Sequence, residues 1–440
     1  MSVCAAQRLA ANSREACVRS FHHGSWSSRE ENRTQRRPHM AQEAPSKTVF
    51  GELMLDASGT IDASWLASKL GKPVETAHVR GMDKIGGMSA EFLHVHVHCK
   101  GGETLTLALK TKTPSSAILG DAREALFYEH LAPALGVCVP TAFYSHGDMQ
   151  TGRKAVLMEC LQDALPAGLA FGPSNPNNWA VKDKLEEMAA TLPDAEQISA
   201  HAFKVFAGLH ARFWGEEALL VKAPWLRGAQ WARGEGAETW SGAQKMASDA
   251  WAGLMEARAA GSSPLVWDDH LVQCLDHAFA SVSWDAFQAE LKTRPRTLVQ
   301  GDCHPGNALW VRGAEPTAHV RLIDFEMVGV GSAAQELGQW TISHMEPATR
   351  RRCERSLVEG YHRELVAALT SRGLSAEAGA FGLEKCWAEY VAGGAGRWAW
   401  FVAYLGKVMP AAPAQFFHDQ LAAFLRDHVP DPSCMPMPRV

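Results

Sequence analysis

Two short polar segments carry the residues of this 440-residue chain that are best suited to chemistry. Residues 300–307 read QGDCHPGN, and residues 323–326 read IDFE. Two strand-like runs with a Gly- and Pro-containing turn connect them, so we expect a β-hairpin that returns Asp324 beside Asn307. Phosphoryl transfer needs such a set: a carboxylate, here Asp302, to orient an acceptor hydroxyl, and a carboxylate with an amide oxygen to hold Mg²⁺ against phosphates.

The plainer interpretation is that Asp302 and Asn307 only shape a turn, since Asp, Asn, Gly and Pro are the usual turn residues. Both segments occur together, however, and an apolar strand leads directly to Asp324. Because three roles of one reaction are then assembled in one place, the pattern favours a catalytic site.

The two segments resemble the catalytic loop and the metal-binding motif of the aminoglycoside phosphotransferase and choline kinase superfamily. Its members are small-molecule kinases with a protein-kinase-like fold, their loop usually reads H-G-D-x-x-x-x-N, and their metal motif reads I-D-F/W-E/Q/D. The chain keeps Asp302, Asn307 and Asp324 but has Gln300 where His is usual. We expect this departure to affect the conformation of the loop more than the reaction that the loop supports.

Weaker similarities extend over roughly residues 60–425. A short helix that Asp62 is expected to cap carries Trp65-Leu66, and this helix, with the pair Phe127-Tyr128, resembles the ecdysteroid-kinase-like and choline-kinase-like branches most. His210 resembles a recurring helix feature of the superfamily, and we expect it to support the catalytic loop.

The pattern of apolar residues predicts an α+β, two-lobed fold, and the resemblance to the family implies that this fold is protein-kinase-like. Residues 92–100 and 104–110 alternate around a Gly-Gly turn, whereas the chain from Pro176 onward is mostly helical apart from the hairpin. We therefore expect a nucleotide-binding lobe over residues 49–161 and a helical catalytic and acceptor-binding lobe over residues 162–430.

Two segments of the first lobe are candidate ATP contacts. Gly86, Gly87 and Ser89 lie between strands, where backbone N–H groups can approach phosphate oxygens closely, although a plain hairpin turn is the alternative. By its position, this run resembles the loop that covers the phosphates in the family. The strand that ends at Glu159 resembles the hinge between the lobes, which contacts adenine through backbone groups.

Lys110 and Glu124 form the other candidate contact with ATP. Kinases use a buried Lys, anchored by a helix Glu, to hold the α- and β-phosphates. Lys110 ends an apolar strand, and the run from Glu124 to Tyr128 (EALFY) resembles the corresponding helix of the family. Lys112 competes for the role because it lies on the same strand face, and a solvated lysine at a strand end is the plain alternative.

Two further patterns have a structural explanation that we prefer. His94, His96 and His98 alternate along one strand, which fits a solvated face better than a metal site. Tryptophans cluster between Trp214 and Trp251. Aromatic walls of this kind suit a quaternary ammonium or a flat apolar alcohol, but ordinary helix packing also accounts for them.

The composition sets limits on partners and location. A formal charge of −5 gives no reason to expect nucleic acid or an anionic membrane as a partner, and no apolar run is long enough to span a bilayer. The ten cysteines form no CxxC pair, so we expect reduced thiols and a cytoplasmic location. Residues 1–48 are rich in Arg and Ser and predict a disordered leader or a mitochondrial or plastid transit peptide.

These observations predict an ATP- and Mg²⁺-dependent kinase that acts on a hydroxyl group of a small molecule. A nucleotide-binding pseudokinase without turnover is the alternative, and only Gln300 and Glu336, which stands where the family has Asp, favour it. A protein acceptor is disfavoured because no activation segment ending in A-P-E is recognisable. The sequence specifies neither the acceptor nor the oligomeric state.

Overall fold

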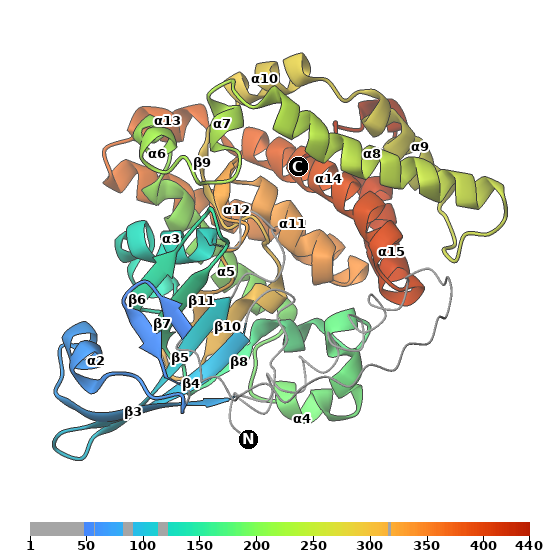
Figure 1. Ribbon diagram of the computed structural model, residues 1–440. Coiled ribbons are helices and arrows are strands. Elements are labelled where there is room, and N and C mark those ends of the chain that lie inside the picture. The colour runs from blue at the N-terminus through green and yellow to red at the C-terminus, as the bar shows by residue number, and fades with distance from the viewer. Residues whose placement is uncertain (1–47, 57, 82–90, 113–121, 316–317) are drawn as a thin grey trace, which may run out of the picture.

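The computed structural model describes residues 48–56, 58–81, 91–112, 122–315 and 318–440. Figure 1 shows a β-rich lobe built from the first part of the chain and a larger helical lobe built from the rest. The α+β, two-lobed prediction is therefore confirmed. The boundary between residues 161 and 162 stays a prediction.

A five-stranded antiparallel sheet forms the body of the first lobe, with strand order β3-β4-β5-β7-β6. The strands are β3 (Val74–Gly81), β4 (Glu91–Cys99), β5 (Thr104–Lys112), β6 (Ala142–Gly147) and β7 (Lys154–Glu159). The expected hairpin between β4 and β5 is present, and Gly101 and Gly102 turn it with φ of 109° and 90°, which favours glycine. The strands β3 and β6 have weaker sequence patterns and were not predicted.

Two helices accompany this sheet. The helix α2 (Ala63–Leu70) begins as expected, because Asp62 accepts a hydrogen bond from the Trp65 N–H at 2.6 Å. The helix α3 (Arg123–His130) packs against β6 and β7. A small hairpin of β1 (Thr48–Phe50) and β2 (Leu53–Leu55) precedes α2.

The helical lobe is organised around pairs of long helices. In it, α5 (Ala195–Arg212) packs on α12 (Pro347–Ser371), while α14 (Leu383–Val408) packs on α8 (Ala237–Ala259), α11 (Gln335–His344) and α15 (Ala411–His428). The shorter helices are α4 (Leu185–Ala189), α6 (Glu217–Lys222), α7 (Ala229–Ala232), α9 (Asp269–Ala280), α10 (Trp284–Thr293) and α13 (Ser375–Ala380). None of the described helices combines the length and the apolar content that crossing a membrane requires.

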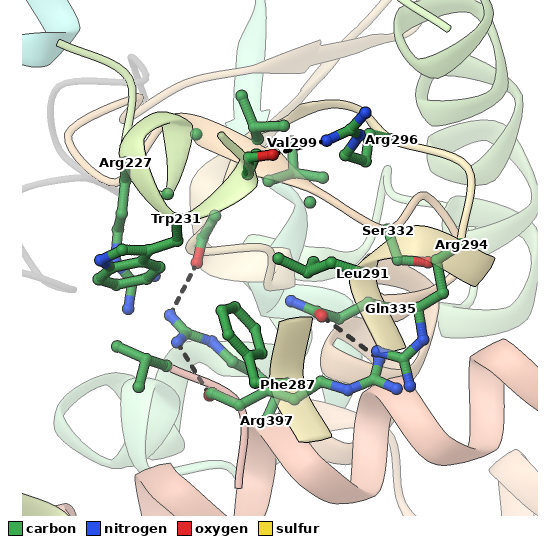
Figure 2. A pocket seen from close by; sticks show the side chains of 18 of the residues that line it. Arg227, Trp231, Phe287, Leu291, Arg294, Arg296, Val299, Ser332, Gln335 and Arg397 are labelled. Atoms are coloured by element: carbon green, nitrogen blue, oxygen red, sulfur yellow. Dashed lines mark hydrogen bonds between the residues drawn. The ribbon is translucent and has the colours of Figure 1, made fainter. Parts of the chain in front are cut away.

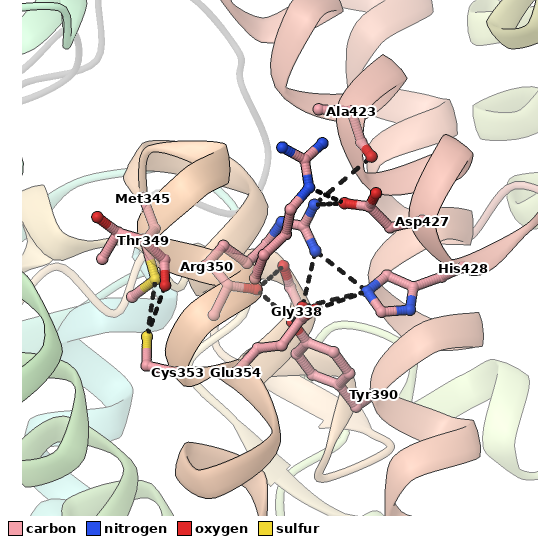
Figure 3. A network of polar contacts seen from close by, with 12 residues as sticks. Gly338, Met345, Thr349, Arg350, Cys353, Glu354, Tyr390, Ala423, Asp427 and His428 are labelled. Carbon is pink, nitrogen blue, oxygen red and sulfur yellow. Dashed lines mark hydrogen bonds and ion pairs between the residues drawn. The ribbon is translucent and has the colours of Figure 1, made fainter.

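A buried polar network ties three of these helices together (Figure 3). Arg350 on α12 donates to Glu354 at 2.8 Å and also pairs with Asp427 on α15. Glu354 accepts a further hydrogen bond from Tyr390 on α14 at 2.8 Å and lies 3.0 Å from His428. Because each buried charge has an opposite charge or a donor beside it, the network fixes how the helices meet rather than leaving an unpaired ion.

Four short strands place the two polar segments side by side. The strand β9 (Thr297–Val299) leads into residue 300, and it pairs with β12 (Gly329–Gly331), which follows residue 326. Between them, β10 (Ala308–Val311) and β11 (Val320–Leu322) form the predicted antiparallel hairpin, and β10 also pairs with β8 (Ala164–Pro166). The pairing of β9 with β12 was not expected. It holds together the start of the first polar segment and the end of the second.

An aromatic contact joins the first lobe to this hairpin. The ring of Phe127 on α3 stacks on that of Phe325, with centroids 3.8 Å apart and planes 8° from parallel. Both side chains are fully buried. Such a pair contributes about 0.5–1.5 kcal/mol beyond the burial of its area. It therefore holds the segment that carries Asp324 against the helix that carries Glu124.

Candidate active site

Asp302 and Asn307 lie at the two ends of one tight loop. The Asn307 Nδ2 atom donates to the backbone carbonyl of Asp302 at 2.9 Å and to its carboxylate Oδ2 at 3.0 Å. Asn307 is buried, whereas 39% of the Asp302 side chain is exposed. Because the amide nitrogen is used inside the loop, Oδ1 is the atom of Asn307 that can serve as a metal ligand.

The surroundings of Asp302 favour its ionised form. Burial alone would raise the pKa of this carboxyl, but His304, Arg397 and Asn307 together hold the pKa below its ordinary value. The Nε2 atom of His304 lies 3.6 Å from Oδ2. Asp302 is thus a carboxylate at neutral pH, partly open to solvent and able to accept a hydrogen bond from a hydroxyl group.

Gln300 connects the catalytic loop to the metal-binding motif. Its Nε2 atom donates to the carbonyls of Ile323 at 3.0 Å and Asp324 at 2.9 Å, and its Oε1 atom accepts from the N–H of Asp302 at 3.1 Å. Asp324 has φ of 62°, and it is the only non-glycine residue with positive φ in the part of the chain that the structure describes. Since such a backbone is strained, the bonds from Gln300 help to hold it.

Glu336 supports the same loop from beneath. Its Oε1 atom accepts from the N–H of Gly301 at 2.8 Å, and its Oε2 atom accepts from the N–H of Gln300 at 3.1 Å. His210 lies 3.0 Å from Oε2 and 2.8 Å from the hydroxyl of Tyr361. All of these groups are buried. The expected support by His210 is therefore present, and it acts through Glu336.

Lys110 lies at the centre of three carboxylates. Its Nζ atom is 2.6 Å from Glu124 Oε2, 3.2 Å from Asp324 Oδ1 and 3.3 Å from Glu326 Oε1. Burial would lower the pKa of Lys110, but the three carboxylates raise it well above its ordinary value. The structure thus brings the predicted pair of Lys110 and Glu124 together with Asp324, and it favours Lys110 over Lys112, which is on the same strand but makes none of these ion pairs.

A second lysine in this cluster was not predicted. Lys154, the first residue of β7, is fully buried, and its Nζ atom lies 2.7 Å from Glu124 Oε2 and 2.5 Å from Glu326 Oε1. In the sequence it precedes an apolar strand and is indistinguishable from a solvated lysine at a strand end. The pairing of β5 with β7, with Lys112 opposite Lys154, brings it into the site. No local sequence signal could have identified it.

The carboxylates of this cluster are arranged as a cation would require. One oxygen each of Glu124, Asp324 and Glu326 lies within 4.8 Å of the others, the only such set of three acidic, His or Cys ligands among the described residues. Burial, opposed by Lys110 and reinforced by Glu124 and Glu326, raises the pKa of Asp324. Carboxylate and amide oxygens suit Mg²⁺, so Asp324 and Asn307 fit the donor set of a magnesium site. His94, His96 and His98 form no comparable set.

The other predicted nucleotide contacts are the glycine-rich run and Glu159. Gly86, Gly87 and Ser89 lie outside the described residues. The side chain of Glu159 accepts from the N–H of Thr141 at 2.7 Å, and its own N–H donates to the Thr141 carbonyl at 2.9 Å. Glu159 therefore ends the strand with its N–H and carboxylate engaged, and its place in an adenine hinge stays a prediction.

A cavity that is partly open to solvent adjoins the catalytic loop at Gly301 and the segment after the metal-binding motif at Met327 (Figure 2). Its wall combines aromatic and basic side chains from α7, α8, α10, α14 and the segments beside them: Trp231, Trp240, Phe287, Arg227, Arg294, Arg296, Arg397 and Arg439. The tryptophans of this region are thus divided between the wall of the cavity and the hydrophobic core. Trp231 and Trp240 line the cavity, whereas Trp214 and Trp251 belong to the hydrophobic core.

Comparisons with known proteins found several solved structures similar to this chain. Among solved structures, an ethanolamine kinase from Plasmodium vivax is 11% identical, with 82% of this chain and 85% of that chain covered and a TM-score of 0.42. A glucosamine kinase is 16% identical (87% and 96% covered, TM-score 0.42), and the GDP complex of wild-type aminoglycoside 2'-phosphotransferase-IIIa is 13% identical (83% and 97% covered, TM-score 0.42). A sequence comparison with curated proteins found no significant match.

The decisive comparison is with the family model described as the phosphotransferase enzyme family, which matches residues 88–372. This range is more than half of the chain and includes Lys110, Glu124 and both polar segments. It confirms the resemblance inferred from the two motifs, while the assignment to an ecdysteroid-kinase-like branch stays a prediction. The chain therefore belongs to the phosphotransferase enzyme family.

Proposed function

We propose that this protein transfers the γ-phosphoryl group of ATP, with Mg²⁺, to a hydroxyl group of a small molecule. The observation that carries the proposal is the convergence of Asp302, Asn307 and Asp324 on one hairpin, opposite the buried pair of Lys110 and Glu124. Each of these residues has one role in phosphoryl transfer, and no simpler structural purpose explains why three buried or strained polar groups meet there.

Asp302 is the residue that acts on the acceptor. Its carboxylate accepts a hydrogen bond from the hydroxyl and directs the oxygen toward the γ-phosphorus atom. As the new O–P bond forms, the bond from phosphorus to the bridging oxygen of ADP breaks, and the hydroxyl proton passes to Asp302. Since the pKa of Asp302 is low, this proton moves late, after most of the O–P bond has formed, which suits a loose transition state.

Lys110 and the metal-binding residues act on the phosphates. Lys110, held by Glu124, is placed to bind the α- and β-phosphates. Asn307 and Asp324 would hold Mg²⁺, which when bound neutralises charge on the phosphate oxygens. Glu326 is already paired with Lys154, so we assign it to holding the cluster together rather than to the metal.

The pseudokinase alternative has less support than catalysis. The two residues that depart from the family pattern, Gln300 and Glu336, both hold the catalytic loop through short hydrogen bonds. Neither displaces Asp302 or Asp324 from the site. The departures are therefore compatible with turnover.

The proposal is tested by ADP release from the purified full-length chain with ATP and Mg²⁺, across a panel of small alcohols. Asp302→Asn removes the proton acceptor at almost unchanged size, and we expect it to reduce turnover by roughly three orders of magnitude. Asp249→Asn, at an exposed position on α8, is the matched control and should leave turnover unchanged. Nucleotide binding without acceptor-dependent ADP release would favour the pseudokinase, and equal turnover by Asp302→Asn would refute the role of Asp302.

A further inference from the structure

The cavity beside the catalytic loop is basic, but most of its arginines are neutralised within the protein. Arg294 and Arg439 pair with Glu290 and Glu389, and Arg296 pairs with Glu217. These three side chains therefore have their charges compensated before any ligand binds. Arg227 and Arg397 differ from them, because no carboxylate lies within ion-pair distance of either one in the described structure.

Arg397 is a buried cation that hydrogen-bonds only to carbonyl groups. Its guanidinium donates to the carbonyls of Gly301 and Arg439, each at 3.3 Å, and lies 4.4 Å from the ring centroid of Phe401. Only 1% of the residue is exposed, and its Nε atom is buried without a hydrogen-bond partner. Carbonyl dipoles solvate the charge in part but do not neutralise it. The bond to Gly301 places this charge directly beneath Asp302.

Arg227 is fixed to the other catalytic segment through its backbone. Its N–H donates to the carbonyl of Val328 at 3.2 Å, and its carbonyl accepts from the N–H of Val330 at 2.8 Å. A Cβ atom at Gly329 would lie 2.6 Å from that carbonyl, so the two segments are as close as they can be. The partly exposed side chain of Arg227 has no hydrogen bond or ion pair within the described residues. It extends beside Trp231 at the edge of the cavity (Figure 2).

Burial disfavours the charge of both guanidinium groups, and the charge of Arg397 adds to the effect on Arg227. Burial and the charges of Arg397 and Arg123 hold the pKa of Arg227 well below its ordinary value, and burial lowers the pKa of Arg397 to about 10. Asp302 opposes both effects, but its carboxylate also interacts with His304 and Asn307. An anion between the arginines would offset the unfavourable burial of their charges, because charge-assisted hydrogen bonds from a guanidinium are among the strongest that proteins make.

We propose that the acceptor carries an anionic group, a carboxylate or a phosphate, which Arg227 binds and Arg397 stabilises from beneath. An apolar part of the same molecule then lies against Trp231, and its hydroxyl group reaches Asp302. This inference rests on the proposed function and narrows it to hydroxy acids or phosphate-bearing alcohols. It also disfavours the quaternary ammonium that an aromatic wall alone would suit, since the positive charge of Arg227 at the edge of the cavity repels a cation.

Binding of size-matched alcohols to the full-length chain tests the inference without requiring turnover. Phenyllactate, phenylpropanediol, the monophosphate of that diol and phenylalaninol share one carbon skeleton and differ in charge. Calorimetry with ADP and Mg²⁺ present keeps the anions out of the nucleotide phosphate site. We expect phenyllactate or the diol phosphate to bind at least roughly tenfold more tightly than the neutral diol, and whichever anion binds identifies the source of the charge. Phenylalaninol should bind most weakly.

Substitutions then connect this preference to Arg227. Arg227→Gln should weaken binding of the anion by roughly ten- to a hundredfold and leave that of the diol unchanged, while Arg227→Lys should restore part of the difference. Arg397→Lys keeps the charge and tests the buried position. Arg258→Gln, at an exposed ion pair of α8, is the matched control. Failure of every anion to bind better than the diol, or an unchanged preference in Arg227→Gln, would overturn the inference, whereas ADP release with neutral alcohols would still support the kinase.

Discussion

The side-chain amide of Gln300 donates to the carbonyl of Asp324 at 2.9 Å, which links the catalytic loop directly to the strained residue of the metal-binding motif. The same side chain accepts from the N–H of Asp302. A residue that departs from the usual His of the family thus joins the two segments that carry Asp302 and Asp324.

We predict that Gln300→Ala lowers kcat by roughly ten- to a hundredfold, because two carbonyls and one N–H lose their partner and Asp324 is no longer held. Gln300→His, which restores the usual residue of the family, should keep more of the activity. Steady-state kinetics, with circular dichroism to confirm folding, measure the effect. Equal activity of Gln300→Ala and the unaltered chain would show that the loop holds its pose without this residue.

The two buried lysines should respond differently to substitution. Lys110→Met removes the proposed phosphate ligand, so we expect turnover to fall by about two orders of magnitude or more. Lys154→Met removes one of the two buried cations that Glu124 and Glu326 share, and we expect it to lower the free energy of unfolding by about 3–5 kcal/mol.

Denaturant titration and ADP release separate these two effects. Lys112→Met changes a lysine on the same strand that makes none of these ion pairs, and it should leave turnover nearly unchanged. A Lys154→Met variant that is as stable as the unaltered chain would show that the buried charge is not needed to balance the carboxylates.

Residues that are close in sequence were predicted well. Asp302, Asn307 and Asp324 lie within one hairpin, whose apolar strands and turn are visible in the sequence, and the structure brings all three together. Lys110 and Glu124 are also close in sequence, since one strand and the helix that follows it position them.

Residues that the tertiary fold brings to the site were not predicted. Lys154 enters it only because β7 pairs with β5, and Arg397 only because α14 passes beneath the catalytic loop. Glu336 was noted as a departure from the family, but its two bonds to the loop depend on where α11 begins. None of these positions follows from local periodicity, because sequence patterns indicate which face of an element is buried and not what it faces.

Asp324 should illustrate a conflict between stability and activity. Burial and the neighbouring carboxylates raise the pKa of Asp324 in the folded protein above its value in the unfolded chain. The folded protein therefore loses stability as the pH rises through the interval between these two pKa values, because the buried carboxyl must then ionise. Asp324→Asn removes that cost. We expect the midpoint of thermal unfolding of the nucleotide-free protein to rise by roughly 2 °C at neutral pH, while turnover falls by orders of magnitude.

Differential scanning fluorimetry across pH measures this effect. The gain from Asp324→Asn should shrink as the pH falls toward the ordinary pKa of an aspartate, because Asp324 itself then becomes neutral. A gain that stays constant with pH would assign the effect to packing and not to charge.

The helices α11 and α14 cross so closely that a side chain added at their contact should be unfavourable. A Cβ atom at Gly338 would lie 2.6 Å from the Tyr390 carbonyl and 2.7 Å from the Cα atom of Gly394, and both of these partners are backbone atoms that cannot move aside cheaply. The close approach holds Glu336 under the catalytic loop. Gly338→Ala should therefore destabilise the protein by about 2–4 kcal/mol and lower kcat even below the unfolding temperature.

Gly253→Ala is the matched control, since nothing lies within 4 Å of a Cβ atom at this exposed position of α8. It should stabilise the protein by about 0.5–1 kcal/mol through helix propensity alone. Chemical denaturation compares the two variants, and both should be assayed for ADP release at a temperature where each is folded. If Gly338→Ala were as stable as Gly253→Ala, the two helices would have room to separate, and the placement of Glu336 would not depend on their contact.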